Sequence, residues 1–172
     1  MGKSKEKDEI IMFLNTWELP NDSRIPREHL TTQEDLKTYF AQENTDNLTD
    51  VILFRNDLRK VVSNSSLKVI NQWIIKRNIN IQMMVDNGRY RLDFHTNQNS
   101  IIDHILILIL RKVEEGNFHR YKICPDCKWA FYDRSKSSTK KWCSMKKNSS
   151  SGRACGTIAK VKKYREKNKK SK

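Results

Sequence analysis

Glycine, proline and cysteine are scarce in this chain of 172 residues, which has five, three and four of them. So few glycines and prolines exclude a collagen-like repeat and a Pro/Gly linker protein, and four cysteines are too few for a disulfide-dense scaffold. Long apolar runs are lacking too, since the longest spans residues 101–110 and is interrupted by Asp103 and His104. A membrane-spanning helix needs about 20 apolar residues. We therefore expect a buried helix at this run and no membrane partner.

An export signal is also lacking. Only five apolar residues, 10–14, follow the charged residues 1–9, and no small-residue cleavage site comes after them. Glu6 stands where a myristoylation site needs Ser or Thr. We therefore expect a cytoplasmic protein, in a compartment that disfavours structural disulfides.

Negative charge is scarce in the C-terminal third. The whole chain has 34 Lys and Arg against 20 Asp and Glu, a net charge of +14. Residues 1–116 carry 16 and 17 of these, whereas residues 117–172 carry 18 and three, a net charge of +15 for this module. A balance this basic predicts a polyanionic partner, most often nucleic acid. The asymmetry also predicts two domains, residues 8–116 and residues 117–172.

Catalytic patterns are lacking as well. His29, His95 and His104 have no spaced serine, cysteine or carboxylate partner in the sequence, and the chain has no Gly-rich phosphate loop and no nucleophile elbow. We expect a protein that is not an enzyme.

The first 116 residues predict an α+β domain that is mostly helical. Thr31 or Thr32 begins a helix to about Gln42 with a capping box, and Thr49 begins a second helix that ends at residues 63–66. A third helix follows, and then Asn87-Gly88 predicts the tight turn of one β-hairpin. In its second strand Tyr90, Leu92 and Phe94 alternate with polar residues, which is typical of a half-buried strand. A last helix, capped by Asn97 or Asn99, runs to Glu115 with Gly116 at its end.

The four cysteines, Cys124, Cys127, Cys143 and Cys155, are confined to 32 positions. Two thiolates separated by two residues can bind one metal ion, and two more from a distant segment complete a tetrahedron. We therefore expect a structural Zn²⁺ bound by these four residues. A redox dithiol needs a βαβ context that the sequence lacks, and replacement of one cysteine by His119 is a minor alternative.

The residues around the cysteines predict a small core and a basic helix. A strand follows Cys127, with Trp129 and Phe131 on one face, and we expect them and Trp142 to pack over the metal site rather than on bases. A helix begins near residue 157, and its apolar stripe of Ile158, Val161 and Tyr164 should dock on the zinc core. The candidate nucleic-acid contacts are basic residues of two segments: Arg134, Lys136, Lys140, Lys141, Lys160, Lys163, Arg165 and Lys167.

This C-terminal pattern resembles the CGNR zinc finger of bacterial proteins. The block Lys141-Trp-Cys-Ser-Met145 and the fifteen-residue gap before Cys143 match that family closely, and Cys155-Gly156 follows. Two features depart from it. Thr157 and Ile158 replace the signature Asn and Arg, and a polar loop at 147–153 separates the last two cysteines. Loop-closure entropy grows slowly with length, so we expect zinc binding to survive.

The N-terminal region resembles the companion ABATE domain, through Phe13-Leu-Asn-Thr-Trp17 and Leu30-Thr-Thr-x-Glu-Asp-Leu36 and the late hairpin and helix. The two resemblances together imply a stress-induced transcription regulator of the bacterial cytoplasm. The zinc finger and basic helix would bind DNA, and the N-terminal domain would sense a small-molecule effector or form a homodimer. An RNA- or ribosome-binding zinc-ribbon protein, or a protein-interaction module, is the alternative function.

Overall fold

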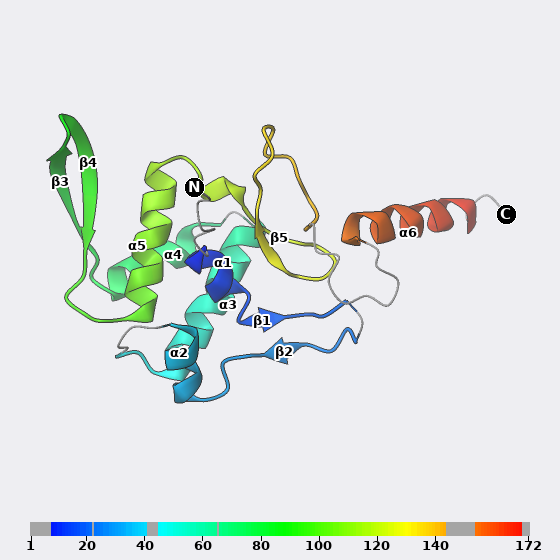
Figure 1. Ribbon diagram of the computed structural model, residues 1–172, viewed down its shortest axis with the longest axis horizontal. Helices are drawn as coiled ribbons and strands as arrows, with labels where there is room; N and C mark the ends of the chain where they lie inside the picture. The colour runs from blue at the N-terminus through cyan, green and yellow to red at the C-terminus, as the bar shows by residue number, and fades with distance from the viewer. Residues whose placement is uncertain (1–7, 22, 41–44, 65, 144–153, 170–172) are drawn as a thin grey trace, which may run out of the picture.

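The computed structural model describes residues 8–21, 23–40, 45–64, 66–143 and 154–169 and confirms the predicted α+β class (Figure 1). In chain order the elements are α1 (Glu9–Leu14), β1 (Trp17–Glu18), β2 (Arg27–Glu28), α2 (Gln33–Tyr39), α3 (Leu48–Asn64), α4 (Lys68–Lys76), β3 (Asn80–Asp86), β4 (Arg89–His95), α5 (Ile101–Glu114), a 3₁₀ turn (Phe118–Arg120), β5 (Tyr121–Ile123), β6 (Ala130–Tyr132) and α6 (Cys155–Lys169). The strands form three antiparallel pairs, β1–β2, β3–β4 and β5–β6. Among the described residues, no helix combines the length and the apolar character needed to cross a membrane.

Helices α1, α3 and α5 surround one hydrophobic core. Phe13, Phe54, Leu58, Ile105 and Leu106 are all fully buried there. The rings of Phe13 and Phe54 lie 5.5 Å apart between centroids, within the range of favourable aromatic pairs. The apolar run at 101–110 is therefore the inner helix of the domain, as its length predicted.

Three helix starts show which polar side chains cap them. Thr32 forms the predicted capping box with Asp35. Helix α3 is capped by Asn47, whose Oδ1 accepts a hydrogen bond from the Asp50 amide at 2.8 Å, so the prediction that Thr49 caps this helix is wrong. Helix α5 is capped by Ser100, whose side chain accepts a hydrogen bond from the Asp103 amide, so the prediction that Asn97 or Asn99 caps this helix is also wrong. In both cases the cap is the residue whose oxygen reaches the third amide of the helix, and neighbouring polar residues competed for that role.

The turn residues behave as predicted. Asn87 and Gly88 both have positive φ, of 50° and 75°, in the two-residue turn between β3 and β4. Gly116 has φ 68° at the end of α5, a conformation that glycine adopts without strain. Helix α2 ends at Tyr39, earlier than the predicted Gln42, and residues 41–44 lie outside the described part of the chain.

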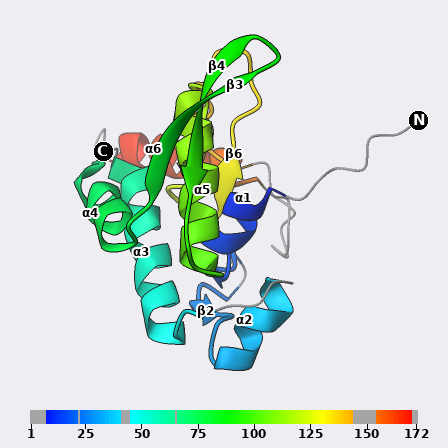
Figure 2. The ribbon, with the colours of Figure 1, turned by 90° about the vertical axis from the view of Figure 1, so that its left-hand side faces the viewer.

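The hairpin β3–β4 is more exposed than its alternation predicted. Of the three alternating residues of β4, only Phe94 is buried, whereas Tyr90 and Leu92 are 87% and 42% exposed. Figure 2 shows the hairpin as the outermost element on its side of the described chain. The prediction of a half-buried strand therefore holds only at the base of the hairpin.

The packing is continuous across residues 116 and 117, where the net charge changes. Tyr121 of β5 and Ala130 of β6 belong to the same hydrophobic core as α1 and α3. The hydroxyl of Tyr121 also donates to the carboxylate of Asp8 at 3.1 Å. The basic module thus begins with a hairpin that is packed onto the N-terminal region, and the division into two domains stays a prediction.

Candidate metal centre

The first two cysteines are positioned by the hairpin β5–β6. The chain leaves β5 at Cys124 and turns back into β6, and the Cys124 amide donates to the Trp129 carbonyl at 2.9 Å. The Lys128 amide closes the turn on the Cys124 carbonyl at 3.0 Å, with Lys128 at φ 58°. This tight knuckle turns the sulfurs of Cys124 and Cys127 toward one point.

The hairpin β5–β6 is hydrogen-bonded to the N-terminal region. The amide side chain of Asn15 donates to the Ala130 carbonyl at 3.0 Å and accepts from the Ala130 amide at 2.8 Å. Arg59 of α3 donates to the carbonyls of Leu14 and Lys128, at 2.5 and 2.6 Å. The knuckle is therefore held by residues more than sixty positions away in the sequence.

The other two cysteines come from the segments on either side of residues 144–153, which lie outside the described residues. Cys143 follows Trp142, and Cys155 is the first residue of α6. Gly156 lies against the Trp142 indole, where a Cβ would stand only 3.2 Å from Cδ1. Glycine at this position lets α6 begin next to the indole and brings Cys155 to the knuckle.

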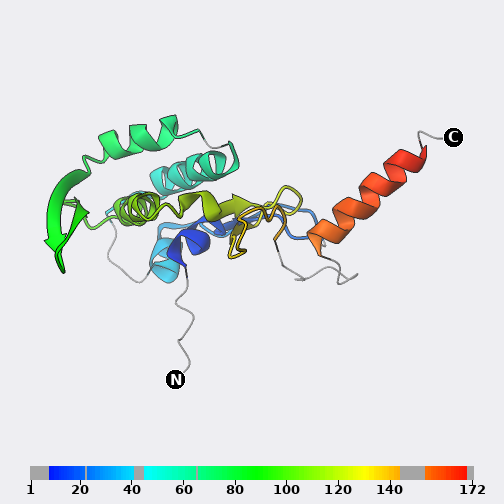
Figure 3. The same cartoon turned by 90° about the horizontal axis from the view of Figure 1, so that it is seen from above.

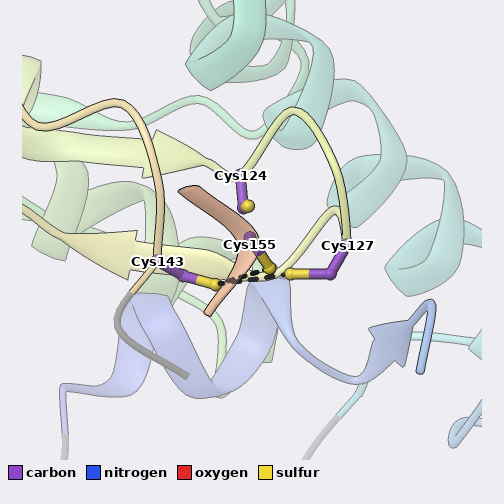
Figure 4. A group of neighbouring side chains, drawn as sticks. All are labelled: Cys124, Cys127, Cys143 and Cys155. Carbon is purple, nitrogen blue, oxygen red and sulfur yellow. Dashed lines mark hydrogen bonds between the residues drawn. The ribbon is translucent and has the colours of Figure 1, made fainter. Parts of the chain in front are cut away.

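The four sulfurs form one buried cluster (Figure 4). All lie within 4.8 Å of one another, with 3.4 Å between Cys127 and Cys143 and 3.7 Å between Cys143 and Cys155. Zinc bonded tetrahedrally at about 2.3 Å to each sulfur would separate the sulfurs by roughly 3.8 Å. All four cysteines are free of disulfides. The donor set and its spacing therefore fit a structural Zn²⁺, as the sequence predicted, and His119 is not part of the cluster.

The pKa values of Cys124 and Cys127 are shifted because their thiols lie close to each other and to that of Cys143. Hydrogen bonding from the Cys127 and Cys143 thiols holds the pKa of Cys124 well below its usual range. The pKa of Cys127 is raised because its thiol is hydrogen-bonded with Cys124 and Cys143. The cluster thus favours the thiolate form of Cys124 and disfavours that of Cys127. A bound cation would stabilise both as thiolates.

One contact to the cluster comes from a residue that the sequence did not indicate. The side-chain amide of Asn21, in the connection between β1 and β2, lies with Nδ2 3.5 Å from the Cys155 sulfur. An N–H donor beside a metal thiolate orients the ligand and disperses its charge. An asparagine 134 positions from its partner gives no local signal in the sequence.

Aromatic side chains cover the cluster as predicted. Phe131 is 9% exposed and packs with the four cysteines, and Trp129 and Trp142 pack partly buried against the same group. These rings form the small core of the finger.

Asp133 holds the segment that follows β6. It is fully buried and accepts from Lys122 Nζ at 2.7 Å, from the Ser135 hydroxyl at 2.6 Å and from the Lys140 amide at 2.9 Å. These hydrogen bonds, led by that of Lys122, keep the pKa of Asp133 well below its usual range. Arg120 supports the same segment by donating to the carbonyls of Asp133 and Ser135. In the sequence, Asp133 stands in the pattern Phe131-x-Asp133-Arg134-Ser135, which is part of the resemblance to the CGNR zinc finger, but nothing there indicates this role.

The candidate nucleic-acid residues lie on two segments beside the cluster. On the segment that Asp133 holds, Arg134, Lys136 and Lys141 are exposed, and Lys140 is half-buried with Nζ 5.8 Å from the Phe131 ring centroid. On α6, Lys160, Lys163 and Arg165 are exposed, and the side chain of Lys167 lies outside those that the structure describes. Within the described part of the chain, none of the six exposed residues has an ion pair with a carboxylate. Their positive charge is thus open to solvent on both segments.

Helix α6 joins the cluster through its first residue, Cys155. Ile158 and Val161 are partly buried, but Tyr164 is 67% exposed, so the prediction that all three dock on the zinc core is wrong for Tyr164. Figures 1 and 3 show α6 extending away from the rest of the described chain. Nothing in the sequence distinguishes a helix that lies on the core from one that only begins there.

Comparison with known proteins supports the C-terminal part of this picture. Residues 120–168 match the family model described as the CGNR zinc finger. The match spans all four cysteines and most of α6, and the resemblance of the N-terminal region to the ABATE domain stays a prediction. A comparison with curated proteins found no match for the chain.

Proposed function

We propose that this protein is a zinc-dependent DNA-binding transcription regulator, in which the basic module binds the duplex. The observation that carries the proposal is the position of exposed basic residues on two segments that adjoin the buried four-cysteine cluster, one ending at Cys143 and the other starting at Cys155. A merely soluble surface would mix charges of both signs, whereas residues 154–169 contain one acid, Glu166.

Bound zinc supplies a cross-link between the knuckle and the start of α6. With that end fixed, Lys160 and Lys163 lie about one turn apart on one side of a helix that stands clear of the N-terminal region, and Arg165 lies on another side. An exposed helix of this kind fits the major groove or the phosphate backbone, and the phosphate contacts give affinity that falls steeply with salt. Arg134 and Lys136 extend the basic surface from the neighbouring segment.

The N-terminal region would supply regulation, by ligand sensing or by dimerisation. Its core accounts for most of the buried apolar residues, and its net charge of −1 gives it no attraction to DNA. A single small finger reads few base pairs, so paired fingers would raise specificity.

The test is a selection from a randomised duplex-DNA pool at physiological salt, with the zinc-loaded full chain and with the chain after chelation. We expect an enriched motif that disappears on chelation. Flat enrichment with zinc bound would contradict sequence-specific regulation, and tighter binding to structured RNA at equal salt would favour the RNA-binding alternative.

A matched pair of variants tests the surface. Lys163→Ala should lower the slope of log affinity against log salt by about 0.9, the value for one lost phosphate contact on B-DNA. Lys68→Ala removes the same charge from an exposed position at the start of α4, in the N-terminal region, and should leave the slope unchanged. Equal effects of the two variants would contradict binding through α6.

A further inference from the structure

The hairpin β3–β4 has one apolar and one polar face. The register pairs Ile81 with Phe94, Met83 with Leu92 and Val85 with Tyr90. Because side chains alternate across a strand, these six residues share one face. The other face carries the remaining residues of the two strands: Asn80, Gln82, Met84, Asp86, Arg89, Arg91, Asp93 and His95.

The apolar face is open to solvent. Met83 is 84% exposed, Tyr90 87%, Val85 63%, Ile81 54% and Leu92 42%, and only Phe94 at the base is buried. An isolated two-stranded hairpin is marginally stable in water, and single exposed apolar residues are common but a contiguous set is not. A face of five neighbouring exposed apolar side chains therefore calls for a covering surface.

We propose that this face packs against the same face of a second copy of the chain, about a two-fold axis, to form a homodimer. The proposal goes beyond nucleic-acid binding and does not depend on it. A two-fold contact brings one surface patch against itself, which requires the patch to be self-complementary. An apolar face without a charged residue meets that condition.

The size of the face is close to what a dimer needs. Its five exposed side chains present on the order of 600 Å² of surface, and a standard interface takes about 800 Å² from each partner. Tyr90 and Leu92 also line a cleft whose other residues include Arg91 and Asp93 of the polar face and Arg111 and Glu114 of α5, which provide a charged rim. A rim with both signs of charge can meet its own copy without net repulsion.

The distribution of charge over the whole chain favours a second copy at this place. The +15 of residues 117–172 would repel between copies, but α6 lies at the opposite end of the molecule from the hairpin (Figure 1). Copies joined through their hairpins keep the basic modules apart, while the region that makes contact has a net charge of only −1.

The test is sedimentation velocity of the zinc-loaded full chain over a range of micromolar concentrations, without nucleic acid. The wild-type chain should be a dimer that persists at high salt, because the contact is apolar. Met83→Lys should weaken the dimer on the order of a hundredfold, since the buried side chain occurs once in each copy. Gln82→Lys places the same charge on the polar face, opposite Asp93, and should leave the dimer intact.

Folding of the variants is checked by their circular dichroism spectra and zinc content, which should match those of the wild type because Met83 is almost fully exposed in one copy. Tyr90→Lys provides a second variant on the same face and should act like Met83→Lys. A monomeric wild-type chain, or a dimer that both Met83→Lys and Tyr90→Lys leave unchanged, would overturn the proposal. Either result would remove dimerisation through this face from the roles proposed for the N-terminal region, but would leave the expected zinc-dependent enrichment of a DNA motif unchanged, so the two proposals fail separately.

Discussion

The two pairs of cysteines reach the same cluster by different routes. Cys124 and Cys127 stand on a hairpin that shares the hydrophobic core of the N-terminal region and is bonded to it through Asn15 and Arg59. Cys143 ends the segment that Asp133 holds through the Lys140 amide, and Cys155 begins α6, beside Asn21 and the Trp142 indole. The first pair is therefore positioned by the fold, whereas Cys155 and α6 depend most on the metal.

Removal of zinc should have the largest effect on the difference between the two pairs of cysteines. Chelation should release α6, because structural zinc contributes about 10–16 kcal/mol of apparent binding energy in small fingers. Amides of residues 155–169 should exchange rapidly with solvent, while those of α3, α5 and β5 stay protected. Hydrogen exchange with mass spectrometry measures both in one sample, and loss of protection in β5 together with α6 would contradict the comparison.

Replacing a ligand of the second pair should have a smaller effect of the same kind. Cys143→Ser removes one of four ligands and should cost about 3 kcal/mol or more of zinc-binding free energy, releasing the metal and unfolding the finger beyond the knuckle. Zinc content per chain and the thermal transition of the N-terminal region are the measurements. Unchanged zinc content and folding would show that the four-cysteine site is wrong.

The bonds of Asn15 test the other side of the comparison. Asn15→Ala leaves the Ala130 amide and carbonyl without their partner and should destabilise the protein by about 1–3 kcal/mol, with zinc retained. Urea denaturation measures the change. Asn97→Ala, at an exposed position between β4 and α5, is the control and should change the free energy of unfolding by less than about 0.5 kcal/mol.

The smallest expected effect is at the start of α6. Gly156→Ala places a methyl group about 3.2 Å from the Trp142 indole and forces the ring to shift, at a cost of roughly 1 kcal/mol. Zinc affinity, measured by competition with a chromophoric chelator, should fall by about tenfold or less. An equal effect of Thr157→Ala, at the exposed next residue, would show that the indole contact is not the cause.

The sequence predicted the features whose determinants lie close together along the chain. The capping box of Thr32, the turn at Asn87-Gly88, the end of α5 at Gly116 and the cysteine spacing all depend on residues a few positions apart. The family match confirmed the finger by the same local pattern.

The features that sequence could not predict depend on distant partners. Arg55 is 1% exposed in the core, where it forms a bidentate pair with Glu28, and Arg77 pairs with the fully buried Asp103. A charged residue in a sequence predicts a surface position, because burying an unpaired charge is costly. Only an oppositely charged partner, brought close by the fold, offsets that cost. Asn21 beside Cys155 and the exposed Tyr164 are of the same kind, because each depends on how an element is placed in space.

The four-thiolate site also changes the charge of the module that contains it. Four thiolates and one Zn²⁺ sum to −2, so the +15 of residues 117–172 becomes +13 when the site is loaded. Metal binding thus makes the module less attractive to a polyanion as a diffuse charge, while fixing the end of its basic helix. Attraction by charge alone would make the metal-free chain the tighter ligand at low salt, whereas recognition by a positioned helix requires the loaded chain to bind more tightly, so the sign of the zinc effect identifies which one operates.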